Sequence, residues 1–444
     1  MKTSLHFVLL FLLIASAVLP DTIFGQGTEK KEKMFGIAFT GYVNCDLFFD
    51  SRQTVMAREG QLLYYPENVK PDAVGNDINA KGTFNILSIQ TRVTGTITGP
   101  DLFRAKSSGV IEGEFFGNIN PNINSFRLRL AYVRLKWKST DLTLGQNWHP
   151  MYVPGYMPEV ISLNSGAPFL VFSRNPQIRI GQDLGKFRIQ LSAISQVDAT
   201  SNGPDGASPK YLRNSILPEL NIMAQFSSKN EEKNTEFAVG AGFDFLMLTP
   251  RLSTEVVIKP AVDTVINNVV VHQDAVVETY ATRAKSYGLA GSIYAKIQLR
   301  PVTLKMGAVY GTDCYAFNMI GGYAVKSITD SLKGFVDYAP IRTGSVWLDF
   351  KTNGQRWQPG IFLGFSKNFG STGDITGPCY ARGSNIGYLY RISPRIALRL
   401  NKFKVATELE YTVAAYGTPT SNGSVTDQNE VGNWRILLGV FYYF

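Results

Sequence analysis

The chain has 444 residues, a length that suits either two or three ordinary domains or one large all-β body. Gly (41), Tyr (21) and Phe (28) are plentiful and charged residues make up only 18%, a composition typical of many strands joined by tight turns. The formal net charge is +9, but no Lys/Arg block or nucleic-acid motif accompanies it, so the charge does not indicate a nucleic-acid partner.

Residues 1–25 have the pattern of a secretory signal peptide. Lys2 precedes an apolar stretch from Phe7 to Val18, and the segment ends at the small residue Gly25. The apolar core is too short for a membrane helix, which needs about 20 residues, and no later stretch supplies one. We therefore expect residues 1–25 to be removed on export and residues 26–34 to form a periplasmic N-terminal segment.

From Phe35 onward, apolar residues recur at every second position. In the first such segment Phe39 and Phe49 lie on one face, with Asn44 and Asp46 on the other. The pattern returns near residues 35–50, 81–98, 105–117, 125–138, 141–148, 175–183, 186–197, 216–228, 235–247, 284–300, 301–312, 342–352, 359–369, 384–400, 402–416 and 431–444. Some runs, such as 386–400, are longer than the about 5 to 6 residues usual in soluble strands.

Lipid cannot hydrogen-bond a free backbone group, so a sheet that spans a membrane must close on itself. The sequence therefore predicts that residues 35–444 form an all-β, transmembrane antiparallel β-barrel of about sixteen strands in the outer membrane. A secreted soluble β-sandwich is the alternative for such alternation.

The connections between these segments alternate between long and short, as expected for external loops and periplasmic turns. The long ones are 51–80, 118–124, 149–174, 198–215, 248–283, 313–341, 370–383 and 417–430. Both chain ends then lie in the periplasm. Two places strain the scheme: segment 125–138 changes parity, which requires a β-bulge or snorkelling, and segment 250–283 is either an extracellular hairpin or two further strands, giving eighteen.

The last strand carries apolar and aromatic residues at alternate positions and ends on an aromatic residue. These residues are Trp434, Ile436, Leu438, Val440, Tyr442 and Phe444. The arrangement resembles the terminal signal by which the outer-membrane barrel assembly machinery recognises its substrates.

Several stretches resemble a known family. Residues 41–53 (GYVNCDLFFDSRQ) resemble the first strand of the trimeric dicarboxylate-type (DcaP-like) porin superfamily. The stretches 77–81 (DINAK), 127–133 (RLRLAYV) and 145–150 (GQNWHP) are similar to uncharacterised Bacteroidetes members of that superfamily. The resemblance covers mainly residues 35–215 and implies a sixteen-stranded homotrimer that passes small anionic solutes.

Inward parity predicts charged side chains that line the lumen. They are Arg92, Glu112, Glu114, Arg127, Arg129, Arg391, Arg395, Arg399, Glu408, Glu410 and Arg435. Basic and acidic rows fall on neighbouring strands, which favours cross-strand ion pairs that stiffen the wall. The alternative hypothesis is that unpaired arginines stand across a constriction and favour anions.

Segment 149–174 is unusually rich in proline and apolar residues for an external loop. We expect it to fold into the lumen and narrow it, with a cover over the barrel mouth or a subunit contact as alternatives. Cys314 and Cys379 fall in loops on the same side of the membrane, where two free thiols are favoured over a disulfide.

The sequence favours a passive porin over an enzyme. Outside the signal peptide only His149 and His272 remain, and HExxH, GxSxG and paired-cysteine motifs are missing, so no cofactor or metal is predicted. A barrel that serves secretion, assembly or adhesion, with 51–80 and 313–341 as docking loops, is the second hypothesis. A barrel hydrolase is a minor third.

Overall fold

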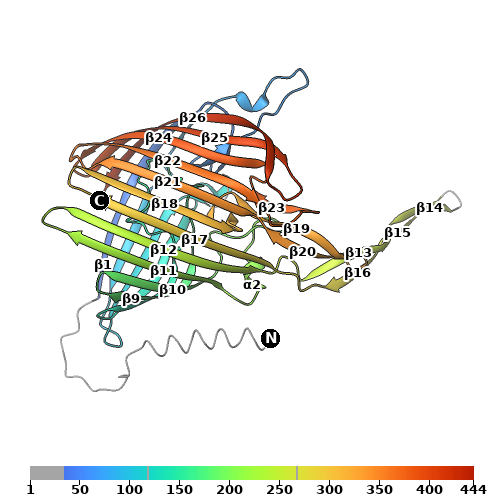
Figure 1. The fold of residues 1–444 in the computed structure, drawn as a ribbon, viewed down its shortest axis with the longest axis horizontal. Helices are drawn as coiled ribbons and strands as arrows, with labels where there is room; N and C mark the ends of the chain where they lie inside the picture. Colours follow the sequence, from blue (N-terminus) through green and yellow to red (C-terminus); the bar gives the residue numbers. More distant parts are fainter. Residues whose placement is uncertain (1–34, 118–119, 267–268) are drawn as a thin grey trace.

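The computed structural model describes residues 35–117, 120–266 and 269–444; the expected signal peptide and the segment 26–34 lie outside them. The structure is a closed antiparallel barrel of sixteen strands, as the sequence predicted (Figure 1). Each strand position is called a stave here, because one position is shared by two short strands. The barrel strands are β1 (Gly36–Asp50), β4 (Thr83–Leu87), β5 (Arg92–Thr98), β6 (Lys106–Phe115), β7 (Phe126–Lys136), β8 (Thr140–Trp148), β9 (Arg174–Leu184), β10 (Phe187–Ile194), β11 (Glu219–Asn230), β12 (Thr235–Leu248), β17 (Ser286–Gln298), β18 (Val302–Thr312), β21 (Arg342–Thr352), β22 (Trp357–Gly370), β24 (Ile386–Leu400), β25 (Phe403–Pro419) and β26 (Val425–Tyr443). Strands β4 and β5 both pair with β1 and make one interrupted stave.

The first and last strands close the sheet. β1 and β26 pair from Tyr42 opposite Tyr443 to Asp50 opposite Arg435. Beyond the ladder, the backbone N–H of Phe444 donates to the carbonyl oxygen of Gly41 at 3.1 Å. A Cβ on Gly41 would lie 2.2 Å from the backbone oxygen of Arg92, so this close approach requires glycine. The closed sheet satisfies the hydrogen-bonding requirement that hydrocarbon imposes.

Buried charge crosses the same seam. The guanidinium of Arg435 donates to both carboxylate oxygens of Asp50, at 2.9 and 2.6 Å, and the amide of Asn433 donates to Asp50 at 2.8 Å. Arg435 is fully buried, although it lies on the lumen side of the wall. These bonds therefore fasten the two terminal strands from within.

The barrel has sixteen staves and not eighteen because residues 253–281 leave the sheet. β13 (Ser253–Lys259) pairs with β16 (Val276–Ala281), and β14 (Val262–Ile266) pairs with β15 (Val269–Gln273). These two ladders form a hairpin that projects away from the barrel (Figure 1). The hairpin interpretation is correct, and the eighteen-strand alternative is wrong.

The remaining elements lie at the same end as this hairpin. They are β2 (Thr54–Ala57), β3 (Leu62–Pro66), β19 (Gly321–Asp330), β20 (Phe335–Pro340), β23 (Cys379–Arg382), the helix α2 (Lys210–Arg213) and the single 3-10 turns η1 (Ile78–Ala80), η2 (Asn120–Asn122) and η3 (Tyr315–Phe317). Among the described residues, no helix is long and apolar enough to cross a membrane.

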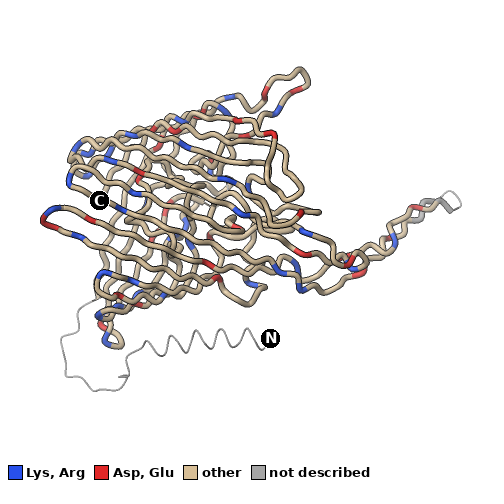
Figure 2. Tube along the Cα trace, viewed as in Figure 1, with Lys and Arg blue, Asp and Glu red and all other residues tan. Residues whose placement is uncertain are grey.

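Long and short connections alternate as expected, with one correction. Residues 417–430 are not a long loop, because β25 continues to Pro419 and β26 begins at Val425. Polar residues such as Thr418 and Thr426 pair there, since backbone pairing beyond the hydrocarbon needs no apolar face. Lys and Arg are visible at the short turns, at the end of the barrel where the C-terminus lies (Figure 2).

The parity change in β7 is a β-bulge. Glu112 of β6 lies opposite Leu130, whereas the next residue, Gly113, lies opposite Leu128, so Arg129 is the extra residue. After the bulge Val133 faces outward and the neighbouring Arg134 faces inward, where it forms an ion pair with Asp141 at 3.3 Å. The sequence prediction of an irregularity in this strand is confirmed.

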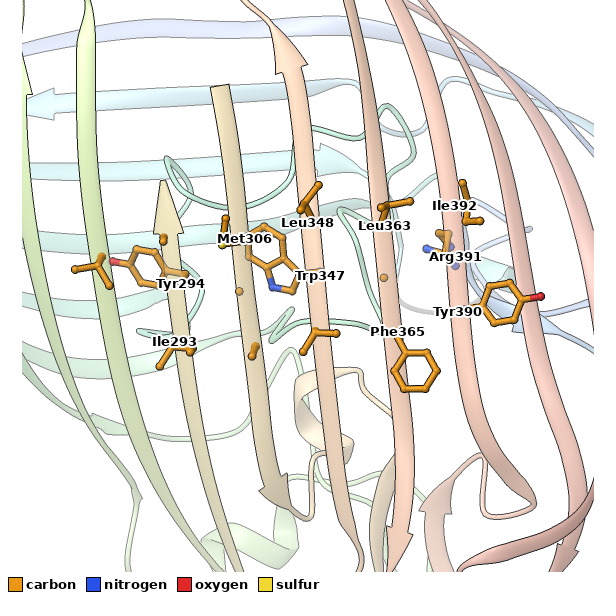
Figure 3. A pocket seen from close by; sticks show the side chains of 16 residues that line it. Ile293, Tyr294, Met306, Trp347, Leu348, Leu363, Phe365, Tyr390, Arg391 and Ile392 are labelled. Atoms are coloured by element: carbon orange, nitrogen blue, oxygen red, sulfur yellow. The ribbon is translucent and has the colours of Figure 1, made fainter. Parts of the chain in front are cut away.

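The outer face of the barrel is apolar. Exposed Ile293 of β17 and Leu363 of β22 line a hollow of about 650 Å³ in this face, together with residues of the intervening β18 and β21 (Figure 3). Aromatic pairs occur near both rims, for example Phe187 with Phe226 at 5.0 Å and, near the other rim, Tyr411 with Trp434 at 4.3 Å. Apolar bands bordered by aromatic residues are typical of membrane barrels.

We expect Arg435→Ala to destabilise the barrel strongly. The substitution leaves Asp50 buried without its cation, which costs about 3 to 5 kcal/mol. The control, Arg399→Ala, removes an exposed guanidinium that donates to Gln358 at 3.0 Å and should cost less than about 1 kcal/mol. Urea unfolding in lipid vesicles measures the free energy of unfolding of both variants. Equal losses would mean that the Asp50–Arg435 pair stabilises the barrel no more than an exposed side chain does.

Candidate functional site

Residues 149–173, here called the constriction loop, lie inside the barrel. The carboxylate of Glu159 forms ion pairs with two inward-facing lysines, Lys305 of β18 at 2.8 Å and Lys351 of β21 at 2.5 Å. The backbone N–H of Glu159 also donates to Asp349 at 2.8 Å. The expectation that this segment folds into the lumen is therefore confirmed.

The loop continues along the inner wall to β24 and β25. The N–H of Ile161 donates to Glu408, and the amide of Asn164 donates to Glu410 at 2.9 Å. The guanidinium of Arg391 donates to the carbonyl oxygen of Ala167 at 2.8 Å. Inward polar groups of the wall thus satisfy the backbone of a loop that has no regular secondary structure of its own.

The apolar sequence of the constriction loop explains why the loop is buried inside the barrel and does not extend into solvent. Met157, Phe169 and Leu170 are almost fully buried and belong to one large apolar cluster within the barrel. Phe169 also packs against Phe362 of β22, with ring centroids 6.1 Å apart. Burying side chains of this size contributes about 1.5 to 3 kcal/mol each, which favours the inserted position.

A second segment enters the lumen beside the constriction loop. It is the β2–β3 hairpin, residues 54–66, whose Leu62, Tyr64 and Tyr65 join the same apolar cluster. Arg391 donates to the carbonyl oxygen of Leu63 at 3.2 Å and to that of Tyr64 at 3.1 Å. Arg391 therefore ties both inserted segments to β24.

The predicted lumen-facing residues of β5, β6 and β7 form one network with three further residues. This network is here called the guanidinium cluster. It consists of Arg58, Arg92, Arg127, Arg129 and Arg174 with Glu112, Glu114 and Asp198. Glu114 accepts from three of the arginines, at 3.0 Å from Arg92, 3.0 Å from Arg127 and 2.6 Å from Arg129. Most of these arginines are thus paired across strands, yet the cluster holds five guanidinium groups against three carboxylates.

The cluster lies at the level of the constriction loop. The ring of Trp148, the last residue of β8 before the loop, has Arg174 at 4.7 Å and Arg129 at 5.6 Å from its centroid. These stacking contacts hold the guanidinium groups in place beside the loop.

Sequence reasoning missed two cations of the cluster: Arg174, the first residue of β9, and Arg58. Arg58 lies in the turn between β2 and β3, over the ring of Phe116 at 4.5 Å, and no described carboxylate forms an ion pair with it. Burial and the neighbouring Arg127 lower the pKa of Arg58 to about 10, which leaves it charged at neutral pH. A residue in a connection has no parity, so alternation could not place Arg58 in the lumen.

The remaining predicted residues are distributed along the β21–β26 side of the wall. Arg395 forms an ion pair with Asp349 at 2.6 Å, and Arg391 lies 3.6 Å from Glu410. Arg399 is exposed near the short-turn end. The alternating residues that the sequence offered as an assembly signal face outward on β26, where Trp434, Ile436 and Tyr442 are exposed.

The three cysteines are free thiols. Cys314 is buried, whereas Cys379 is exposed on β23, so the disulfide left open by the sequence does not form in this structure. Burial raises the pKa of the Cys314 thiol, which keeps it protonated at neutral pH.

His149 has acidic partners that the sequence did not reveal. Its Nε2 lies 2.9 Å from Glu219 of β11 and 3.4 Å from Asp244 of β12, and all three side chains are buried. Burial alone would lower the pKa of His149, but hydrogen bonds with Asp244 and Glu219 raise it to about 9. The partners lie at least 70 residues away in the chain, so no local motif marks the group.

Comparison with solved structures identifies the architecture. The outer-membrane channel DcaP of Acinetobacter baumannii superposes with a TM-score of 0.64 at 14% identity, over 92% of this chain and 97% of that one. The fold is that of the outer-membrane porins.

Two further porin-fold structures agree at lower similarity. An anion-selective porin from Comamonas acidovorans has a TM-score of 0.52 at 10% identity, over 93% of this chain and 100% of that one. The trimer form of OmpT, an outer-membrane protein of Vibrio cholerae, has a TM-score of 0.50 at 9% identity, over 93% and 100%. No protein-family model and no curated protein sequence matches the chain.

We expect Glu159→Gln to loosen the constriction loop. Glu159 is 40% exposed, so we assign its ion pairs about 1 kcal/mol, which corresponds to roughly a fivefold larger detached population. A spin label at position 155, in a chain whose three cysteines are replaced by serine, reports the mobile fraction. Glu255→Gln in the exposed hairpin is the matched control and should leave the spectrum unchanged.

The same label tests the pH dependence. Burial alone would raise the pKa of Glu159, but Lys305 and Lys351 lower it to about 2, below its ordinary value of 4.5. The contribution of the ion pairs is therefore present above pH 4.5 and is lost only as pH falls toward 2. The spectrum should stay unchanged from pH 7 to pH 4.5; mobility that rises within this range would contradict the assignment.

Proposed function

We propose that this protein is an outer-membrane porin through which small hydrophilic solutes, preferentially anions, diffuse passively. The porin role is supported by the fold shared with outer-membrane channels and by a loop inserted into the lumen. The anion preference depends on one observation, the excess of guanidinium groups over carboxylates beside the constriction loop. Fixed positive charge along a pore lowers the energy of passing anions.

The wider biology follows from the same proposal. We infer export through the signal peptide, recognition of the C-terminal strand by the barrel assembly machinery, and a barrel in contact with outer-membrane lipid with both termini in the periplasm. A homotrimer is supported by the trimer form recorded for OmpT of Vibrio cholerae. We propose no catalytic role.

One observation favours a second candidate function. The hairpin of β13 to β16 projects well beyond the barrel, as a docking or adhesion element would (Figure 1). The two loops that the sequence offered for docking are less suited to it. The β2–β3 hairpin packs inside the lumen, and β19 pairs with β20 and β23.

Planar-bilayer recordings in a KCl gradient distinguish these functions. A porin gives stable ohmic steps, whereas a closed scaffold gives none. For the porin proposed here, the zero-current potential should show that chloride carries most of the current. Current carried mainly by potassium would contradict the anion preference.

Arg58→Gln should lower the anion-to-cation permeability ratio. A unit charge about 7 Å from the ion path in water changes the energy of a monovalent ion by about 0.6 kcal/mol, with opposite sign for anion and cation. The ratio therefore changes by about 1.2 kcal/mol, and we expect a drop of up to roughly sevenfold. Arg356→Gln, at an exposed residue between β21 and β22, is the matched control and should leave the ratio unchanged. An equal effect of both substitutions would show that the cluster does not set the preference.

A further inference from the structure

His149, Glu219 and Asp244 have the arrangement of a metal site. One ligand atom from each lies within 4.8 Å of the others, and the imidazole Nε2 is 2.9 and 3.4 Å from the two carboxylates. Zinc bonds of 2.0 to 2.2 Å in a tetrahedron separate ligand atoms by about 3.3 to 3.6 Å. Small side-chain shifts would therefore let the three groups bind one ion.

The charge in this region is not balanced by the protein. Glu219, Asp244 and Asp313 are each 2% exposed, and within the described ranges no Lys or Arg forms an ion pair with any of them. A protonated His149 would neutralise only one of three carboxylates. Buried carboxylates need a cation or a full set of hydrogen bonds, because their desolvation is costly.

Asp313 is the second, independent sign of a missing cation. Neither of its carboxylate oxygens has a hydrogen-bond partner among the described residues. Its carboxylate lies in the field of Glu219, and the adjacent Cys314 lies in the fields of both Asp313 and Asp244. The same turn packs on the imidazole, with the ring of Phe317 at 5.1 Å from that of His149.

Neighbouring groups already orient the proposed ligands. The amide of Asn221 donates at 3.0 Å to Oδ1 of Asp244, the same oxygen that lies 3.4 Å from Nε2 of His149, and so holds this carboxylate beside the imidazole. The N–H of Met151 approaches Nδ1 of His149 at 3.3 Å. This long hydrogen bond is given up if the imidazole binds a metal through Nε2 and carries its proton on Nδ1.

We propose that His149, Glu219 and Asp244 bind a divalent transition-metal ion of the Zn²⁺ class, with Asp313 as an outer carboxylate that the ion's charge stabilises. The site is structural: it fastens the first residue of the constriction loop, which directly follows β8, to β11 and β12, beyond the intervening β9 and β10. It goes beyond the proposed porin role, because a barrel could conduct with or without it.

The test is a Zn²⁺ titration of the whole barrel, refolded in detergent after treatment with chelator. Calorimetry should give one Zn²⁺ per chain, and the same ion should raise the thermal unfolding midpoint. His149→Ala should weaken binding at least hundredfold and Asp313→Asn about tenfold. His272→Ala is the matched control, because His272 lies in the projecting hairpin beside Asp263, and it should bind like the unsubstituted chain.

Folding of each variant is checked by heat-modifiable mobility in gel electrophoresis. If His149→Ala does not fold, Glu219→Gln replaces it and should weaken binding at least tenfold. A barrel that binds no Zn²⁺, or a His149 or Glu219 variant that binds as the unsubstituted chain does, overturns the proposal. His149 would then be an imidazole held only by hydrogen bonds to two carboxylates.

Discussion

Closure of the sheet between β1 and β26 is the constraint on which the structure depends. A strand that crosses hydrocarbon must pair all of its backbone N–H and C=O groups with neighbouring strands. The terminal strands can do so only by pairing with each other, which they do from Tyr42 to Asp50. The buried Asp50–Arg435 pair adds a charged contact across that seam, on the lumen side.

Once the sheet is closed, two different environments act on alternate side chains. Outward residues meet lipid and are apolar, whereas inward residues are largely polar or charged. In this protein the lumen is further divided by the constriction loop and the β2–β3 hairpin, which share one apolar cluster. The polar wall groups that hold them, such as Lys305 and Arg391, are therefore unavailable to a passing solute, and the guanidinium cluster on the opposite wall is the charge that remains beside the constriction.

Much of the fold could be predicted because the alternation has a direct physical cause. All sixteen staves follow from the period of two. The parity change in β7 indicated either a bulge or snorkelling, and the structure has a bulge there, at Arg129. The alternation is lost in segments whose side chains do not face lipid. It missed the polar extension of β25 and β26, and it could not place Arg58, because a turn that folds inward has no periodicity.

The candidate sites show the same division. Arg92, Glu114 and Arg127 could be assigned to one wall from their parity, and their pairing follows from neighbouring strands. His149, Glu219 and Asp244 come together only because the chain turns inward directly after β8 and reaches β11 and β12 past two intervening strands. No spacing in the sequence encodes that meeting, so the sequence predicted no metal there.

Closure can be measured directly with one engineered cysteine. Native Cys45 lies opposite Val440 across the seam, and opposed residues in antiparallel strands have Cα atoms about 4.5 to 5.5 Å apart, within disulfide range. In a chain with Cys314 and Cys379 replaced by serine, Val440→Cys should oxidise to an intramolecular disulfide in the folded barrel, and the displaced Ile436→Cys should not. Efficient oxidation of Ile436→Cys, or none with Val440→Cys, would contradict the closed register.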